Sequence, residues 1–288
     1  ENTPKDTVFC VLMMDFQPGI DGFVRKDIFE QLDELKEIRD MYPQKILPFI
    51  AINPNNRRHF ELFAKAFSEE YSFFGVKIYP SLGYMPSHPD LMKIFEICSK
   101  YDIPVTTHCG TGAIHASVNK HNLKYFIINK RDELILKEEK KIFYFKKQFD
   151  KFFNSPQNWK PVLNAFPNLR LNLAHFGDNL ISDRAKSSSK KWTNSIIELI
   201  NAYPNVFTDV SYILHNPKMY SELKNMIKTN QKLGERILYG SDFHHIAISG
   251  KYKQLRTIFA KKMGKKVMRK ISVENPLNFL NIQVLENV

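Results

Sequence analysis

Short apolar, β-branched runs that alternate with amphipathic stretches constrain the fold of this chain more than any other feature. Seven such runs occupy residues 8–13, 46–52, 73–79, 103–108, 170–175, 206–211 and 237–242. The clearest amphipathic stretches are residues 27–40, 57–70, 89–100, 192–202 and 219–233. Near-continuous apolar runs are typical of parallel strands that are covered on both faces, and their alternation with helices indicates βαβ units. The sequence therefore predicts an α/β fold with a parallel sheet.

The polar residues that end these runs favour a barrel over an open, doubly wound sheet. A (β/α)8 TIM barrel gathers the polar residues at the carboxyl ends of its strands on one rim, where its active site lies. A doubly wound sheet usually carries a glycine-rich phosphate loop, and neither G-x-G-x-x-G nor G-x-x-x-x-G-K-[ST] occurs here. We therefore predict a TIM barrel with about seven of its eight units visible, the missing unit lying on the N-terminal side.

Composition narrows the class of protein further. The chain has 288 residues, of which 43% are apolar, and no apolar run approaches the roughly 20 residues of a membrane span. The net charge of +12 is spread over many lysines, which argues against nucleic-acid binding and suits attraction of small carboxylates. Cys10, Cys98 and Cys109 make a poor disulfide framework, so we expect a reduced, cytoplasmic protein.

One connection is too long for a plain barrel unit. Roughly 60 residues separate the runs at 103–108 and 170–175, and their middle is dense in Lys, Phe, Tyr and Ile. An insertion after the carboxyl end of a strand lies above the pocket. We expect one domain over residues 1–288 with an inserted, lid-like segment around 116–158, a surface decoration or oligomer contact being the alternative.

Three strand ends carry residues that suit a metal site. His108 ends one run and precedes a turn with Gly110 and Gly112, His175 repeats this layout on the next run, and Asp242 ends the last one. Neutral imidazoles and a carboxylate are usual ligands of Zn²⁺ and related ions, which make hydroxide available at neutral pH. Singly, a strand-end histidine is more often structural, and Asp242 could cap a helix. Their shared placement favours metal ligands.

An ordered set of motifs resembles the amidohydrolase superfamily. The motifs are GVKIYP at 75–80, LGY at 82–84, IPVTTHCG at 103–110, LAHFG at 173–177, YGSD at 239–242 and NPLNFL at 275–280. The most similar branch is the amidohydrolase-related group that includes aminocarboxymuconate-semialdehyde decarboxylase. The resemblance implies that His108 is a metal ligand and that His175 lies at the metal centre and acts on water or substrate. It also implies that Asp242 is both a metal ligand and a proton-transfer group.

The chain departs from that family at its beginning. The family's first strand carries a His-x-His pair of metal ligands, and no His-x-His occurs in this sequence. The first run, at 8–13, resembles the family's second strand. We therefore expect a further N-terminal segment with that strand to precede Glu1.

Other polar residues near the strand ends are candidates for substrate binding. His115 follows the His108 turn, His244 follows Asp242, and Tyr79 ends the third run. Lys77 shares a face with Tyr79 and could line the rim, although a core salt bridge with Asp209 is the favoured interpretation. Packing is the alternative role for Tyr79.

These observations predict a metal-dependent hydrolase that acts on a small, carboxylate-bearing substrate through a metal-activated water. The expected cofactor is Zn²⁺, with Mn²⁺ or Fe²⁺ as alternatives, and the expected partner is a small molecule, with a homodimer left open. Asp242 and His175 are the predicted catalytic residues. A non-oxidative decarboxylase on the same site is the first alternative, and a non-catalytic barrel without first-strand ligands is the second.

Overall fold

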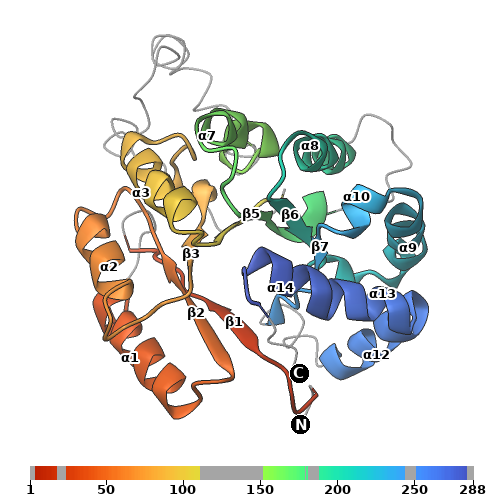
Figure 1. Ribbon diagram of the computed structural model, residues 1–288, viewed down its shortest axis with the longest axis horizontal. Coiled ribbons are helices and arrows are strands. Elements are labelled where there is room, and N and C mark those ends of the chain that lie inside the picture. Colours follow the sequence, from red (N-terminus) through yellow and green to blue (C-terminus); the bar gives the residue numbers. More distant parts are fainter. Residues whose placement is uncertain are drawn as a thin grey trace.

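Seven parallel strands form one curled sheet in the computed structural model of the protein (Figure 1). The structure describes residues 4–17, 24–110, 152–178, 180, 188–243 and 251–283. The strands pair in sequence order, each with the next along the chain. They are β1 (Phe9–Leu12), β2 (Ile46–Ala51), β3 (Gly75–Ile78), β4 (Val105–Thr107), β5 (Leu171–Leu173), β6 (Val206–Asp209) and β7 (Ile237–Leu238).

Helices surround this sheet on its outer side (Figure 1). Asp27 begins α1 with a capping box, because its carboxylate accepts from the Glu30 backbone while Glu30 reaches back to the Asp27 N–H. The described α-helices are α1 (Ile28–Met41), α2 (His59–Ala66), α3 (Pro89–Lys100), α7 (Lys160–Ala165), α8 (Ser188–Ala202), α9 (Tyr220–Thr229), α10 (Gln231–Gly234), α12 (Tyr252–Met263), α13 (Lys265–Arg269) and α14 (Asn275–Phe279).

The predicted elements are all present, with one break. The single helix predicted over 219–233 is two helices, α9 and α10, because Asn230 between them is extended and its side chain caps α10 by accepting from Leu233 N. The strands are shorter than predicted at their carboxyl ends. The polar residues there leave the ladder and turn onto the rim.

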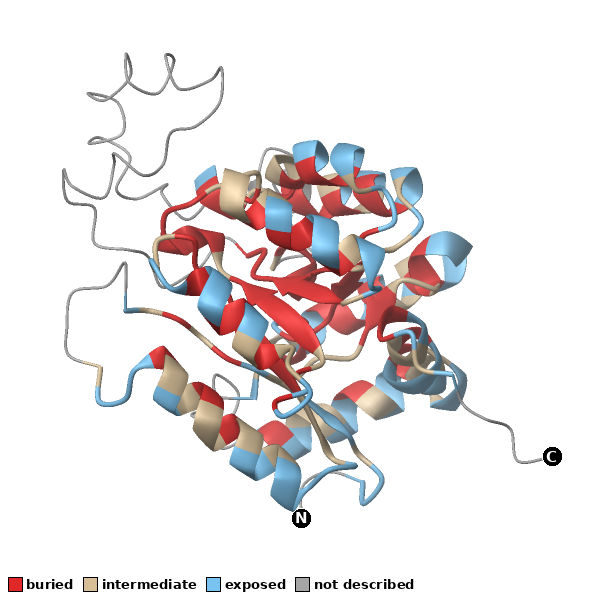
Figure 2. Cartoon of the chain, turned by 60° about the vertical axis from the view of Figure 1, so that its left-hand side comes forward, coloured by how far each residue is buried: buried red, intermediate tan, exposed pale blue. Residues whose placement is uncertain are grey.

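Side chains from distant strands show that the sheet curls. Phe49 of β2 and Phe207 of β6 belong to one buried cluster with Phe279 and Leu280. In a flat sheet, adjacent strands lie about 4.8 Å apart, so side chains of β2 and β6, four strands apart, could not belong to one cluster. The larger core cluster lies between the sheet and the helices, where Figure 2 shows buried residues on the strands and on the inward helix faces.

The sheet curls without closing in the part of the chain that is described. β1 pairs only with β2, and β7 pairs only with β6. β1 is correspondingly exposed, with Phe9 at 43% and Leu12 at 38% of their full accessibility, whereas β3 to β7 are buried throughout. The curled parallel α/β sheet confirms the predicted fold class, and the count of eight units remains a prediction.

The predicted inserted segment falls mostly outside the described residues, which resume at 152. From there Asn154 is buried, and its side chain donates to the Gly110 carbonyl at 3.4 Å. Cys10, Cys98 and Cys109 are free thiols. Among the helices that the structure describes, none combines the length and apolar character that a membrane crossing needs.

Candidate active site on the rim of the curled sheet

Two histidines meet at the carboxyl ends of β4 and β5. His108 Nδ1 and His175 Nε2 lie 3.0 Å apart, and both residues are only 8% exposed. The register brings them together, because Thr107 pairs with Leu173 and each histidine follows its strand closely. The Tyr79 ring packs on His108 with centroids 4.5 Å apart. The structure thus joins two of the three predicted metal ligands.

A buried carboxylate and a hydroxyl from β6 stand behind His175. Ser211 Oγ lies 2.8 Å from His175 Nδ1 and 2.5 Å from Asp209 Oδ1. Asp209 Oδ1 also accepts from the backbone N–H groups of His175 and Ser211, both at 3.0 Å, and Asp209 Oδ2 accepts from the Asn172 amide at 2.8 Å. Burial alone would raise the pKa of Asp209, but the His175 charge and these hydrogen bonds hold it below its ordinary value.

The backbone at His175 is left-handed, which is costly for residues other than glycine. The φ angles are 72° at His175, 45° at Phe176, 75° at Gly177 and 67° at Asp178. An added Cβ on Gly177 would lie 2.8 Å from the Thr193 nitrogen. Asp242 is also left-handed, with a φ of 45°. Such strain persists only where surrounding contacts hold it, and it concentrates at functional sites.

Lys77 and Tyr79 line a small cavity on the other side of the rim, together with Asp15 and Asn53. Lys77 is 5% exposed. Burial lowers the pKa of Lys77 to about 8, although the charges of Asp209 and Asp242 act to raise it. Within the described chain no ion pair joins Lys77 to Asp209, whose oxygens are engaged by other donors. The favoured prediction of a core salt bridge was wrong, and Lys77 lies on the rim.

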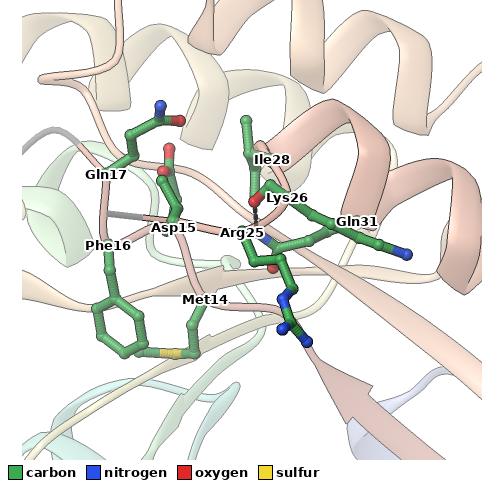
Figure 3. A pocket seen from close by; sticks show the side chains of 9 residues that line it. Met14, Asp15, Phe16, Gln17, Arg25, Lys26, Ile28 and Gln31 are labelled. Carbon is green, nitrogen blue, oxygen red and sulfur yellow. Dashed lines mark hydrogen bonds between the residues drawn. The ribbon is translucent and has the colours of Figure 1, made fainter. Parts of the chain in front are cut away.

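A larger cavity of about 360 Å³ opens beside Asp15 at the carboxyl end of β1 (Figure 3). Met14 and Phe16 lie on one side of the chain there, and Asp15 and Gln17 on the other. Asp15 is 3% exposed, its Oδ1 has no hydrogen-bond partner, and burial raises the pKa of its carboxyl group. The Phe16 ring meets Tyr79 edge-on at 6.1 Å, so an aromatic wall connects this cavity to His108.

Comparison with known proteins identifies the family. The family model described as "Amidohydrolase" matches residues 11–282. The chain belongs to the amidohydrolase family. The predicted resemblance is confirmed, as is the prediction of an enzyme of this superfamily. No curated protein matches the chain.

Solved structures share the fold of this amidohydrolase at low sequence identity. A Staphylococcus aureus protein named for the same family is 15% identical with a TM-score of 0.56, covering 96% of this chain and 87% of that one. A 2,6-dihydroxybenzoate decarboxylase bound to 2,6-dihydroxybenzoate is 15% identical with a TM-score of 0.58, covering 96% and 84%. A 5-carboxyvanillate decarboxylase from Novosphingobium aromaticivorans with bound manganese is 14% identical with a TM-score of 0.55, covering 88% and 70%.

The histidine pair of the amidohydrolase fits two ligands of one divalent ion. Ligand nitrogens about 2.1 Å from an ion lie roughly 3.0 to 3.4 Å apart, which matches the His108–His175 separation of 3.0 Å. Asp242 follows β7 on the same rim. In the described ranges, no group of three or more His, Cys, Asp or Glu side chains is close enough to hold an ion. The described side chains therefore bring two candidate ligands together, and Asp242 as a third ligand stays a prediction.

The remaining predicted site residues divide into two groups. Lys77 and Tyr79 line the small cavity, and their role in substrate binding stays a prediction, whereas His115 and His244 lie outside the described residues. The sequence reasoning missed Asp15 and Ser211 as site residues and treated Asp209 only as a salt-bridge partner. Alternation along 206–211 was the available signal, since Asp209 and Ser211 are two apart and share a face.

Proposed function

We propose that this amidohydrolase is a metal-dependent hydrolase acting on a small, carboxylate-bearing substrate at the rim formed by His108, His175 and Asp242. The single observation that carries the proposal is the buried His108–His175 pair, whose ring nitrogens lie 3.0 Å apart. His108, His175 and Asp242 would hold the ion. Zn²⁺ is our first choice because two imidazoles and a carboxylate are its usual ligands, and Mn²⁺, which solved relatives contain, is the alternative. A bound divalent ion would supply an activated water and polarise the scissile group.

The chain's own residues would bind the substrate and move its protons. Asp242 would accept the proton of the attacking water and return it to the leaving group. Lys77, buried next to the Tyr79 ring, would attract the substrate carboxylate. The Met14 and Phe16 side of the larger cavity would hold the apolar body, and Arg25 and Lys26, which also line it, would favour an anion.

A decarboxylase is the second candidate, supported by the activities named for solved relatives. Several of these are decarboxylases of hydroxylated aromatic acids. The aromatic wall of Phe16, Tyr79 and His108 would suit such a ring. In that reaction Asp242 would deliver a proton to the ring carbon that loses carbon dioxide.

Metal content and product analysis together test the proposal. Protein purified without chelator should hold about one divalent ion per chain, and His108→Ala or Asp242→Ala should remove it and lower kcat/KM on the order of 10²–10⁴-fold. His88→Asn, which keeps the cap that His88 gives α3, is the matched histidine control. Unchanged metal and activity in both alanine variants would reject the site.

Screening should cover N-acyl amino acids, lactone acids and hydroxybenzoates. Release of an acid and an amine or alcohol would support the hydrolase. Release of carbon dioxide from a hydroxybenzoate would instead support the decarboxylase.

Size-exclusion chromatography with light scattering would test whether the protein forms the homodimer that the sequence left open.

A further inference from the structure

The hydrogen-bond chain behind His175 has a direction that its atoms determine. Asp209 receives hydrogens from three groups that can only donate, which are the backbone N–H of His175, the backbone N–H of Ser211 and the Asn172 amide. Both carboxylate oxygens are therefore acceptors. Burial opposes the charge, but these three donors favour the ionised form of the carboxylate.

Ser211 has one hydroxyl hydrogen, and only one placement suits both neighbours. The Asp209 carboxylate has no hydrogen to give, so in the contact between Asp209 Oδ1 and Ser211 Oγ the hydroxyl is the donor. The hydroxyl hydrogen must therefore point to Asp209. Ser211 Oγ is then the acceptor in its 2.8 Å contact with His175 Nδ1, so His175 Nδ1 carries the donated hydrogen.

We propose that Ser211 and Asp209 are positioning residues that fix His175 as the Nδ1–H tautomer and present its Nε2 lone pair to the rim. This inference rests on the proposed function for its chemical meaning. In the proposed reaction, His175 Nε2 either binds the ion or accepts a proton. With His175 in this tautomer, His108 Nδ1 would be the donor in its 3.0 Å contact with His175 Nε2. The same backbone N–H that binds Asp209 also holds the left-handed turn, so the carboxylate sets both ring and backbone.

The packing around Asp209 and Ser211 fits their role in positioning His175. An added Cβ on Gly240 would lie 3.0 Å from Ser211 Cβ and 3.4 Å from Asp209 Cγ. Glycine at 240 therefore lets β7 approach β6 closely enough to enclose the carboxylate and the hydroxyl. Enclosure excludes water, which would otherwise compete for His175 Nδ1.

Nitrogen-15 NMR of the metal-free, histidine-labelled protein tests the tautomer directly. At about pH 8.5, above the ordinary pKa of histidine, long-range proton–nitrogen spectra distinguish the two neutral tautomers, and His175→Gln assigns the signals. We expect His175 in the Nδ1–H form. An Nε2–H form in the unmodified protein would overturn the proposal, whatever the activity.

Three variants separate positioning from simple structural support. Ser211→Ala should release the tautomer and lower kcat/KM about 10- to 100-fold, and Ser211→Thr, which restores the hydroxyl, should recover both. Thr208→Val is the matched control, because it removes a buried hydroxyl of β6 that donates to the Leu173 carbonyl. It should leave the His175 signals and kcat/KM unchanged.

The outcomes also distinguish this inference from the proposed function. An Nδ1–H tautomer that depends on Ser211, in a protein without hydrolase or decarboxylase activity, would keep the hydrogen-bond chain and reject the function. Activity that survives Ser211→Ala, with the His175 tautomer unchanged, would reject the positioning role and keep the function. Circular dichroism and thermal unfolding of each variant establish that it has folded.

Discussion

The rim has two sides that treat their buried polar groups in opposite ways. On the β4–β6 side, Asp209, Ser211 and His175 form a continuous hydrogen-bond chain that reaches His108. On the β1–β3 side, Asp15 Oδ1 has no hydrogen-bond partner, and the buried Lys77 ammonium lies 5.7 Å from the centre of the Tyr79 ring. A buried charge without a partner costs stability, and a bound ligand of opposite charge offsets that cost. The difference indicates that one side is organised for chemistry in advance and the other for receiving a ligand.

Lys77→Met should have the largest effect, because it removes the buried charge of the β1–β3 side. The pKa of Lys77 in the folded protein, about 8, lies below the ordinary value of 10.5, so folding at neutral pH carries the full cost of the buried charge. Between those values the unfolded chain binds more protons, and the stability of the unmodified protein rises with pH. The variant should be more stable near pH 7 by up to about 3 kcal/mol, and this gain should vanish above about pH 10.5.

Urea unfolding at several pH values measures this effect, with Lys228→Met on the exposed surface of α9 as control. Substrate affinity should fall at the same time, because the variant loses the cation that faces the cavity. In the unmodified protein that affinity should weaken as pH rises through about 8. A variant that is less stable near pH 7 would show that Lys77 has a stabilising partner.

Gly240→Ala should disturb the organised side. Its Cβ would press on Ser211 Cβ at 3.0 Å, which is tighter than an ordinary contact. We expect a loss of roughly 1–3 kcal/mol in the free energy of unfolding and a lower kcat/KM, since the hydrogen-bond chain must shift. Chemical denaturation and steady-state kinetics check both. If the Gly240→Ala variant kept the stability and kinetics of the unmodified protein, β6 and β7 would adjust to the added methyl group without cost.

Asp15→Asn should have the smallest effect on stability, and it tests the second buried charge of the β1–β3 side. Burial raises the pKa of Asp15, so its charge destabilises the folded protein above that pKa, and the cost disappears as pH falls below the ordinary 3.8. Asparagine keeps an acceptor for Asn56 Nδ2, now 2.9 Å from Asp15 Oδ2. The variant should gain on the order of 1 kcal/mol near pH 7 and less near pH 4 in thermal unfolding. If the variant and the unmodified protein were equally stable at both pH values, the Asp15 charge would lie in a favourable environment.

Sequence reasoning reached the strands and the histidines but not the contacts between them. The runs at 103–108 and 170–175 are apolar and β-branched, so strands ending near His108 and His175 followed directly. The hydrogen bond between His175 Nδ1 and Ser211 Oγ joins positions 36 residues apart. It depends on the β5–β6 register, in which Leu173 faces Thr208. No local pattern specifies that register. The left-handed turn at His175 was equally hidden, because histidine does not signal positive φ as glycine does.

The exposed strand β1 has a consequence for handling the protein. Phe9 and Leu12 are exposed on a strand whose described pairing uses one edge only. Unpaired strand edges with apolar side chains are templates for strands of other molecules, and proteins commonly oppose this with lysine. The open side of β1 is therefore the expected place for a further strand to pair, either the N-terminal strand predicted from the sequence or, without it, a strand of a second molecule.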